Sequence, residues 1–367
     1  MSEEVAQIAV IRAVIEQYLD PWIEQTLGAL GAIAFLDADH SQIRASIRLP
    51  VPTGGYETEL AAALGEQLRA AGFAQKLVLD LQAAIVARGV QKPLKPLPGI
   101  RNIVAVGSAK GGVGKSTVAV NLALAWAAMG ARVGILDADI YGPSQPTMLG
   151  LGRQKPTSID GKHIRPLEAF GIKAMSIGFL IDPDQPAVWR GPMVTQALTQ
   201  LLGETEWGEL DYLVIDMPPG TGDLQLTLAQ RVPVAGAIIV TTPQEIAVAD
   251  ARKGLRMFEK VLVPVLGIVE NMSTHHCTQC GHEDAIFGTG GGEALAAEAH
   301  IRLLGRLPLD TRIRVEADAG TPSVVAAATS PRGIAYRDLA RRAAGALACR
   351  PRDRSSAFPE IVVERAS

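Results

Sequence analysis

The fold of this chain is decided by Ala109-Lys110-Gly111-Gly112-Val113-Gly114-Lys115-Ser116-Thr117. An apolar run at residues 103–106 precedes this stretch and suits a buried strand, while residues 118–129 are rich in Ala and Leu and suit a helix. A strand, a glycine-rich turn and a helix in this order form the setting of a nucleotide phosphate loop. Glycines let backbone N–H groups close around phosphate oxygens, and the helix N-terminus adds favourable partial charge. A chance glycine-rich turn is the disfavoured alternative, because spacing, strand and downstream carboxylates agree.

The side chains of this loop predict specific roles. We expect Lys115 to reach the β- and γ-phosphates of ATP and Ser116 to hold Mg²⁺. The strict G-x-x-x-x-G-K-[ST] pattern has Gly where this chain has Ala109, which argues against an ordinary phosphate loop more than against a variant with an extra lysine, Lys110. The predicted nucleotide-binding residues are Ala109, Lys110, Gly111, Gly112, Val113, Gly114, Lys115, Ser116 and Thr117.

Length and composition limit the class of protein to which this chain can belong. A chain of 367 residues is long enough for two domains with cores of their own. Its 48% hydrophobic and 20% charged residues are typical of a soluble globular protein, and a net charge of −3 gives no general attraction for nucleic acid or an anionic membrane. The sequence shows neither a signal segment nor a run able to span a bilayer. We therefore expect a cytoplasmic protein without nucleic-acid or membrane partners.

The chain is predicted to contain two domains. Residues 1–87 combine a helical apolar spacing, an alternating strand at 43–49, a second helix at 60–71 and a closing strand at 77–79, which indicates a small α+β domain. A docking module without chemistry of its own is the favoured interpretation of this domain. Residues 88–100 are rich in Pro and basic side chains and predict a semi-rigid linker.

The second domain, residues 101–347, is predicted to be α/β. Short apolar strands at 132–136, 212–215, 237–240 and 265–269 alternate with helical stretches, which predicts a doubly wound, mostly parallel sheet covered by helices on both faces. Ligands of such sheets bind at the carboxyl ends of the strands, where the phosphate loop also lies. Residues 348–367 mix Arg, Pro and Ser and are expected to form a disordered tail.

Carboxylates at two strand ends are predicted to complete a nucleotide site. Residues 133–136 lead into Asp137-Ala138-Asp139, and residues 212–215 lead into Asp216. A strand that delivers a carboxylate at its carboxyl end is the arrangement that holds Mg²⁺ in phosphoryl transfer, so Asp216 is the predicted magnesium residue. Asp139 is the best candidate to orient the attacking water. Taken alone, each Asp could instead be a turn residue or a helix cap.

Two further segments follow predicted strands of the same sheet. Residues 218–222, Pro-Pro-Gly-Thr-Gly, are suited to a loop that senses the γ-phosphate, since ordering of such segments is a common switch device, although a plain turn is the alternative. Asn271 follows the strand at 265–269 and could bind the edge of the base, and a capping role is nearly as well supported.

The pair Cys277 and Cys280 lies after that same strand, beside His275, His276 and His282. Cys-x-x-Cys spacing lets two thiolates converge on one metal. They could form half of a [4Fe–4S] site that a symmetric dimer completes, or a structural zinc site with the histidines. Redox dithiol chemistry is a third possibility, but its usual thioredoxin-like setting is absent. Cys349 is expected to be a packed thiol in the C-terminal helix.

These motifs resemble a known family. The loop at 110–116 resembles the deviant Walker A of the MinD/ParA-type ATPases. Within that group, the Cys-x-x-Cys and four further stretches are similar to the Mrp/ApbC branch of iron–sulfur cluster carriers: DADIYGPS at 137–144, WRGPM at 189–193, DMPPGTGD at 216–223 and ENMS at 270–273. The N-terminal unit resembles the small iron–sulfur assembly domain that is often fused to bacterial members.

The resemblance implies an ATPase that binds a labile [4Fe–4S] cluster at a homodimer interface and passes it to apo-proteins. It implies that Lys110 crosses the dimer to the partner's nucleotide, and that Cys277 and Cys280 are cluster ligands. Lys110, Lys115 and Asp139 are then the predicted catalytic residues. The alternative is a positional ATPase of the MinD/ParA class that acts on membrane or DNA and carries a structural zinc site.

Overall fold

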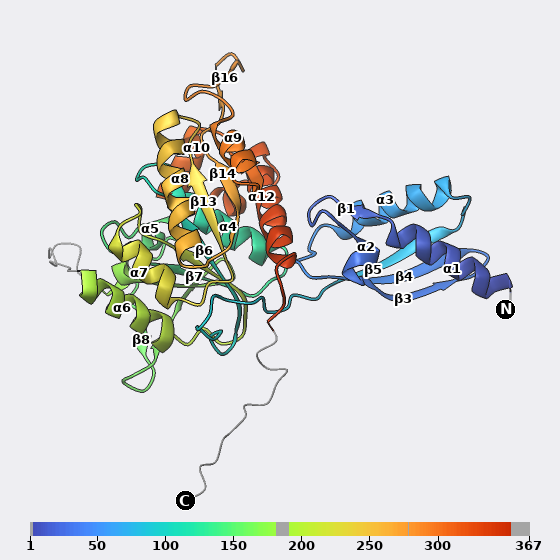
Figure 1. The fold of residues 1–367 in the computed structure, drawn as a ribbon, viewed down its shortest axis with the longest axis horizontal. Helices are drawn as coiled ribbons and strands as arrows, with labels where there is room; N and C mark the ends of the chain where they lie inside the picture. Colours follow the sequence, from blue (N-terminus) through green and yellow to red (C-terminus); the bar gives the residue numbers. More distant parts are fainter. Residues whose placement is uncertain (1–2, 181–190, 278, 354–367) are drawn as a thin grey trace, which may run out of the picture.

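The structure is a computed structural model that describes residues 3–180, 191–277 and 279–353. Figure 1 shows a small N-terminal lobe beside a larger lobe built around one central sheet. The stretch at 189–190 and the tail beyond residue 353 were singled out in the sequence and lie outside the described residues. Among the helices of the described part, none is long and apolar enough to cross a membrane.

The N-terminal lobe is an α+β unit. Its central strand, β4 (Gln42–Leu49), pairs antiparallel with β3 (Ile33–Ala38) and parallel with β5 (Lys76–Ala83). The alternation expected from the sequence holds, because Ile43, Ala45, Ile47 and Leu49 are all buried. The remaining elements are α1 (Glu3–Glu16), β1 (Leu19–Asp20), β2 (Gln25–Thr26), α2 (Leu27–Leu30) and α3 (Glu57–Ala70). Leu60, Leu64 and Leu68 form the buried stripe of α3, as a 3.6-residue period requires.

Asp20 organises the turn after the first helix. The helix ends at Glu16, four residues before the Asp20-Pro21 pair. The buried Asp20 carboxylate accepts hydrogen bonds from the backbone N–H groups of Trp22 and Ile23, each at 2.9 Å, and from the Tyr56 hydroxyl at 2.9 Å. Asp20 therefore fixes a turn rather than a helix end.

The larger lobe is the expected α/β domain, with an eight-stranded sheet in the order β10-β11-β7-β12-β6-β13-β14-β17. All neighbouring strands are parallel except the edge pair β10 and β11. The strands are β6 (Ile100–Gly107), β7 (Val133–Asp137), β10 (Leu167–Ala169), β11 (Ile172–Ser176), β12 (Leu210–Asp216), β13 (Gly236–Thr241), β14 (Val265–Glu270) and β17 (Arg302–Arg306). The five strands predicted for this domain correspond to β6, β7, β12, β13 and β14, whereas β10, β11 and β17 were not predicted.

Helices cover both faces of this sheet. On one face α4 (Lys115–Ala128) packs against α12 (Pro331–Ala348) and α11 (Ser323–Ala326). Another group consists of α6 (Gly191–Glu204), α7 (Asp223–Arg231), α8 (Glu245–Lys260) and α9 (Gly291–Glu298), which pack in succession along the sheet. The smaller elements are α5 (Gln145–Met148), β8 (Thr157–Ser158), β9 (Ile164–Arg165), η1 (Ile177–Phe179), β15 (His275–His276), β16 (Glu283–Asp284) and α10 (Thr311–Asp318).

The expected linker is held against the larger lobe. The amide of the buried Gln91 donates to the carbonyls of Ala229 (2.8 Å) and Val232 (2.7 Å), and its oxygen accepts from the Val234 N–H. Since both ends of this amide are used, the segment around Gln91 is fixed by specific bonds and does not act as a free spacer.

The start of the expected disordered tail is ordered, which corrects that prediction for residues 350–353. Arg352 forms a β-bridge with Arg88, the Gly89 N–H donates to the Pro351 carbonyl and the Asp353 N–H donates to the Ala87 carbonyl, both at 2.9 Å. Backbone groups of the linker and of the tail thus satisfy one another. Neither segment has a periodic pattern of apolar residues, so the sequence contained no local signal for this pairing.

The two lobes meet at the C-terminal end of α12. Arg341 lies over the rings of Trp22 and Tyr56, at 5.0 and 5.1 Å from their centroids, and pairs with Glu59 at 3.1 Å. Cys349 follows the last turn of the helix, is exposed, and its thiol donates to the Ile23 carbonyl at 3.4 Å. The expectation of a packed thiol at Cys349 is therefore wrong, because α12 ends one residue earlier.

Candidate functional site

The phosphate loop connects β6 to α4 at the carboxyl edge of the sheet, as expected. Gly112 and Gly114 have φ of 82° and 84°, the left-handed region that favours glycine, and α4 begins at Lys115. A Cβ at position 114 would lie 2.2 Å from Nδ2 of Asn271, so only glycine fits there. Within the loop Val113 is buried, Ala109, Ser116 and Thr117 are half-buried, and Lys110 and Gly111 are exposed.

Lys115 lies among the predicted carboxylates. Its buried ammonium contacts Oδ1 of Asp216, lies 3.9 Å from Oδ2 of Asp139 and donates to Oγ of Ser116 at 3.1 Å. The structure thus brings together Lys115, Ser116, Asp139 and Asp216, which the sequence assigned to phosphate, magnesium and water. Burial raises the pKa of Asp139 above its usual range, and the Lys115 charge opposes that shift.

Asp137 is a third carboxylate in this cluster, to which the sequence reasoning gave no role. The register of β7 and β12 places Asp137 opposite Asp216. Asp137 accepts hydrogen bonds from the backbone N–H groups of Asp139, Ser144 and Gln145 at 3.0–3.1 Å. Burial and the neighbouring Asp216 raise the pKa of Asp137 to about 7, against the effect of these donors. It ends an apolar strand just as Asp216 does, and that signal could have identified it.

The groups around Asp216 fit a hydrated magnesium ion. The Gln145 amide donates to Oδ2 of Asp216 at 2.9 Å and to the Ser116 carbonyl at 3.1 Å. Oε1 of Gln145 and Oγ of Ser144 are buried and have no hydrogen-bond partner among the described residues. Mg²⁺ prefers carboxylate, hydroxyl and water oxygens. Ser116 and Asp216 are thus the side chains suited to hold the ion, and the unpartnered oxygens suit its waters.

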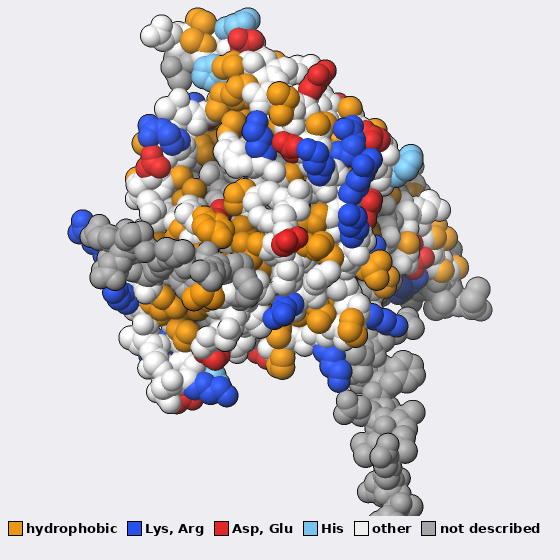
Figure 2. Space-filling view, turned by 60° about the vertical axis from the view of Figure 1, so that its left-hand side comes forward, with side chains coloured by type: hydrophobic (Ala, Val, Ile, Leu, Met, Phe, Trp, Pro, Cys, Tyr) orange, Lys and Arg blue, Asp and Glu red, His pale blue; other side chains and the backbone are white. Residues whose placement is uncertain are grey.

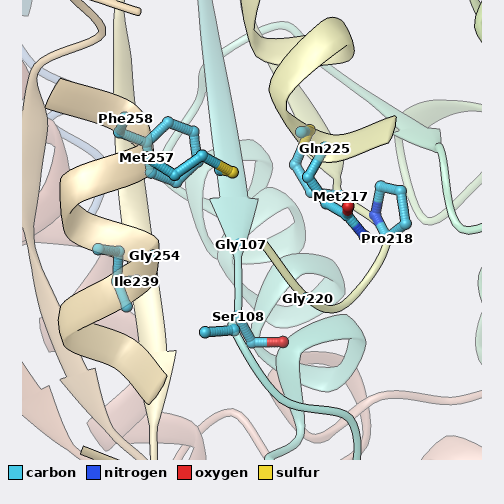
Figure 3. A pocket seen from close by; sticks show the side chains of 11 residues that line it. Gly107, Ser108, Met217, Pro218, Gly220, Gln225, Ile239, Gly254, Met257 and Phe258 are labelled. Carbon is cyan, nitrogen blue, oxygen red and sulfur yellow. The ribbon is translucent and has the colours of Figure 1, made fainter. Parts of the chain in front are cut away.

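Ala109, which departs from the strict motif, faces Gly254 of α8. A Cβ built at Gly254 would lie 3.5 Å from the Ala109 Cβ, an ordinary van der Waals contact, so the Ala109 methyl group fits between the loop and the helix. Both residues line a small, mostly apolar cavity between β6, α8 and the loop after β12, where Met217 and Phe258 face each other across the space (Figure 3). The departure at Ala109 is thus absorbed by packing.

The loop at 218–222 lies directly beside the phosphate loop. The Gly220 N–H donates to the Ser108 carbonyl at 2.8 Å, and the Gln225 amide donates to the Pro219 carbonyl. This placement agrees with the expected contact to a γ-phosphate, and sensing itself stays a prediction.

Asn271 is bound to the phosphate loop. Its buried amide donates to the Val113 carbonyl at 2.8 Å, and its backbone N–H donates to the Thr241 carbonyl at 2.7 Å. Asn271 therefore positions the loop in this structure, and its expected contact with the base stays a prediction. It also begins the segment that leads to the cysteines.

Cys277 and Cys280 lie at the end of a hairpin formed by β15 and β16, which projects from the top of the lobe in Figure 1. The Cys277 N–H donates to the His282 carbonyl, and the Gly281 N–H donates to the Cys277 carbonyl, both at 2.9 Å. Hydrogen bonds from the backbone of Cys280 and Gln279 lower the pKa of the Cys277 thiol. The tight turn thus favours the thiolate, which is the metal-binding form.

The histidines beside the cysteines are turned to other partners. A ring nitrogen of His275 lies 3.0 Å from the Leu309 carbonyl, and His276 lies 3.8 Å from Glu283. Among the described residues, no group of three or more His, Cys, Asp or Glu side chains is placed to hold a metal ion. The zinc site with histidine ligands, an alternative raised by the sequence, therefore finds no support in this geometry.

Comparison with known proteins gives consistent matches. The family model that describes ParA, the NUBPL iron-transfer P-loop NTPase, matches residues 99–344. An iron–sulfur cluster carrier protein of Haemophilus influenzae is 50% identical over 334 residues, which span 90% of each chain. The iron–sulfur cluster transfer protein NUBPL of Mus musculus is 48% identical over 76% of this chain and 87% of its own.

A solved structure is similar as well. The nucleotide-binding protein of Archaeoglobus fulgidus, determined in complex with ADP, has a TM-score of 0.55 and 42% sequence identity. The match covers 60% of this chain and 87% of that one.

Proposed function

Because this chain belongs to the ParA family of NUBPL-type iron-transfer P-loop NTPases, we propose that it is an ATP-dependent iron–sulfur cluster carrier. Two copies hold a [4Fe–4S] cluster between them and pass it to apo-proteins. Transfer is a ligand exchange, in which thiolates of the recipient replace those of Cys277 and Cys280 without a change of oxidation state. ATP and Mg²⁺ bind at the phosphate loop, and hydrolysis yields ADP and inorganic phosphate. Such a carrier acts in the cytoplasm, where thiols stay reduced.

The observation that carries this proposal is the incomplete thiolate site. Cys277 and Cys280 lie at the end of a projecting hairpin, the pKa of Cys277 is lowered, and no third ligand lies close among the described side chains. A [4Fe–4S] cluster takes four thiolates, so a second copy of the same pair supplies what one chain lacks. A site that needs two copies binds and releases its cargo as the copies change their arrangement.

The larger lobe offers apolar surface for such a dimer. Hydrophobic side chains lie across the middle of the face that Figure 2 brings forward, with single charged side chains among them. At the carboxyl edge of the sheet Tyr141 and Ile246 are 68% and 71% exposed, and Met193 at the start of α6 is 52% exposed. Exposed apolar groups of this size favour an interface. Lys110, exposed at the tip of the phosphate loop, is free to contact a nucleotide across it.

A short covalent path links the nucleotide site to the thiols. Asn271 bonds to the phosphate loop, and six residues later the chain reaches Cys277. Between them the Ser273 N–H donates to the Leu307 carbonyl at 3.0 Å, which ties the base of the hairpin to the segment after β17. A phosphate that moves the Val113 carbonyl would also move Asn271. ATP can alter cluster retention only if the two arrangements bind it with different affinity.

The first experiment is anaerobic reconstitution of the full chain with iron and sulfide, beside Cys277→Ala and Cys280→Ala. We expect about four iron atoms per dimer and the visible absorption of the cluster, both lost in each variant. Cys349→Ala is the matched control, because Cys349 lies at the contact between the lobes, and it should keep the full iron content. Zinc alone, or iron that persists without the two cysteines, would contradict the carrier.

The coupling between ATP hydrolysis and cluster transfer is tested on the cluster-loaded protein. Cluster transfer to an apo-ferredoxin is measured with and without ATP, in the native chain and in Lys115→Ala. We expect ATP to change the transfer rate only in the native chain, because Lys115 is the residue proposed to bind the β- and γ-phosphates. A transfer rate that changes neither with ATP nor with Lys115→Ala would show that ATP hydrolysis is not coupled to cluster transfer.

A positional ATPase is less well supported. That function calls for a basic face on a C-terminal helix. Arg341 of α12 is buried between Trp22 and Tyr56, and Arg342 lies 5.4 Å from the Trp22 ring, so these two arginines serve the contact between the lobes.

A further inference from the structure

A cavity of about 700 Å³ lies against the cysteine hairpin. His276 and Glu283, one on each strand of the hairpin, form part of its wall. The opposite side comes from the segment after β17 and from the first turns of α10 and α12. Its volume is in the range of sites that bind ligands. A group bound in this cavity would touch the same hairpin that carries Cys277 and Cys280.

The lining of the cavity is basic on three separate segments. Arg306 ends β17, Arg312 lies in the first turn of α10, and Arg332 lies in the first turn of α12. Each guanidinium has five N–H donors in a planar fork that matches a carboxylate. Arg312 is 61% exposed and Arg306 is 49% exposed, so both keep donors for a ligand. The N-terminus of the 18-residue α12 adds positive partial charge.

The acidic groups near these arginines are paired with them or with the hairpin. Glu283, which lines the cavity, lies 3.8 Å from His276, and Glu270 lies 3.5 Å from Nε of Arg306. Asp310 caps α10 by accepting from the Arg312 N–H at 2.8 Å, and it also pairs with Nε of that side chain at 3.1 Å. Glu316 accepts from Nε of Arg332 at 3.0 and 3.2 Å, and Arg306 pairs with Glu293. Although burial acts to raise the pKa of Asp310 and Glu316, hydrogen bonds and nearby guanidinium charge outweigh it and lower both.

Apolar side chains make up the rest of the cavity. Pro308, Leu309 and Pro331 line it together with the hydroxyl groups of Ser273 and Thr274. A free inorganic anion would leave this apolar surface unused. A peptide that combines carboxylates with apolar side chains would use both kinds of surface.

We propose that this cavity is the docking site for a carboxylate-rich segment of the recipient apo-protein, which places the recipient's cysteines next to the cluster on the hairpin. The inference rests on the proposed carrier function and names the chemistry of its partner. The arginines attract the acidic segment and orient it, and the apolar floor holds it. Release follows when the cluster has left, because the recipient then keeps no thiolate contact with the hairpin.

The test uses Arg312→Glu in the full-length, cluster-loaded protein. Arg312 is an exposed cavity residue, so its replacement should leave the fold intact. The matched control is Arg314→Glu, two residues along the same helix, 67% exposed and outside the cavity lining. Transfer to an acidic apo-ferredoxin is followed by absorption at low ionic strength. We expect the second-order rate constant to fall about tenfold for Arg312→Glu and to change less than about twofold for Arg314→Glu.

A second measurement separates docking from the carrier function itself. Binding of a labelled peptide of alternating Glu and Leu is measured on the cluster-free protein by fluorescence anisotropy, with Gln in place of Glu as its control. We expect Arg312→Glu to weaken binding of the Glu peptide and to leave binding of the Gln peptide unchanged. If no cluster forms but the peptide still binds at Arg312, the carrier function fails and the basic site remains. Equal effects of the two arginine substitutions, or a change only in dimerisation, would overturn the docking site.

Discussion

The phosphate loop and the cysteine hairpin follow strands of one sheet, but their surroundings differ. Lys115 is buried against Asp216 and Asp139, and Asn271 holds the loop from the side. The hairpin has two strands of two residues each, and Cys280 at its end is exposed. One chain therefore brings together most of the predicted nucleotide-site residues, whereas its hairpin supplies only two of the four thiolates that the proposed [4Fe–4S] cluster takes. In the proposed carrier a second copy supplies the other two.

The largest expected effect comes from removing the cation at the centre of the buried site. In Lys115→Ala the carboxylates of Asp216 and Asp139 lose their counter-charge, so we expect a loss of about 3 kcal/mol in the free energy of unfolding. Hydrolysis should fall about 100-fold or more, because the phosphate clamp is gone. Urea unfolding and phosphate release are the measurements.

The neighbouring lysine provides the control for that substitution. Lys110 is exposed, so Lys110→Ala should change the free energy of unfolding by less than about 0.5 kcal/mol while it also slows hydrolysis. Equal stability losses for both lysines would show that the nucleotide site is not organised around Lys115.

The second-largest expected effect is the stability loss in Gly114→Ala, which tests how tightly the phosphate loop is packed. Gly114→Ala places a methyl group in the left-handed region and 2.2 Å from Asn271, so we expect a loss of about 2–3 kcal/mol in the free energy of unfolding. Gly111→Ala is the matched control, since nothing lies within 4 Å of its Cβ, and it should lose under about 0.5 kcal/mol. The free energies of unfolding of both variants are measured by thermal and urea unfolding without nucleotide. Similar losses of stability in the two variants would mean that the loop is not held by Asn271.

The third effect concerns the connection between the two regions. Asn271→Ala leaves the buried Val113 carbonyl without its partner, so we expect a loss of about 1–2 kcal/mol and a cluster transfer rate that no longer responds to ATP. Asn121→Ala is the control, because that buried amide donates to the Thr117 carbonyl at 2.9 Å and accepts from the Val324 N–H at 3.0 Å. It should lose at least as much stability and keep the response to ATP. A response that survives in Asn271→Ala would place the connection elsewhere.

The smallest effect lies in the hairpin and concerns reactivity. The lowered pKa of Cys277 gives it a larger thiolate fraction at neutral pH, so we expect faster alkylation of Cys277 than of Cys280. As pH rises above the usual range of a thiol, the larger thiolate fraction of Cys277 no longer gives it an advantage, and the difference should vanish or reverse, since a weaker base is a weaker nucleophile. Rates of iodoacetamide labelling are measured by mass spectrometry in a Cys349→Ser background. Equal rates across the whole pH range would mean that the turn does not prepare the thiolate.

Sequence reasoning recovered most of the fold because its patterns are local. The alternation at residues 43–49 and the apolar strands of the sheet each follow from neighbours along the chain. Asp139, Asp216 and Lys115 were placed in one site because parallel strands end at one edge. Asp137 was assigned no role, although it ends β7 as Asp216 ends β12. Its position at a strand end was visible in the sequence, but its place opposite Asp216 depends on the register between the two strands.

What the sequence by itself determined is the nucleotide loop, five strands of the central sheet with their alternation with helices, and the thiol pair, because each depends on residues within a few positions of one another. Only the tertiary structure decided that Asn271 holds the loop, that residues 350–353 pair with the linker, and that Ala109 packs against Gly254. Each of these contacts joins segments that are distant along the chain. Their formation depends on how the sheet and its helices pack, and that packing is a property of the whole domain.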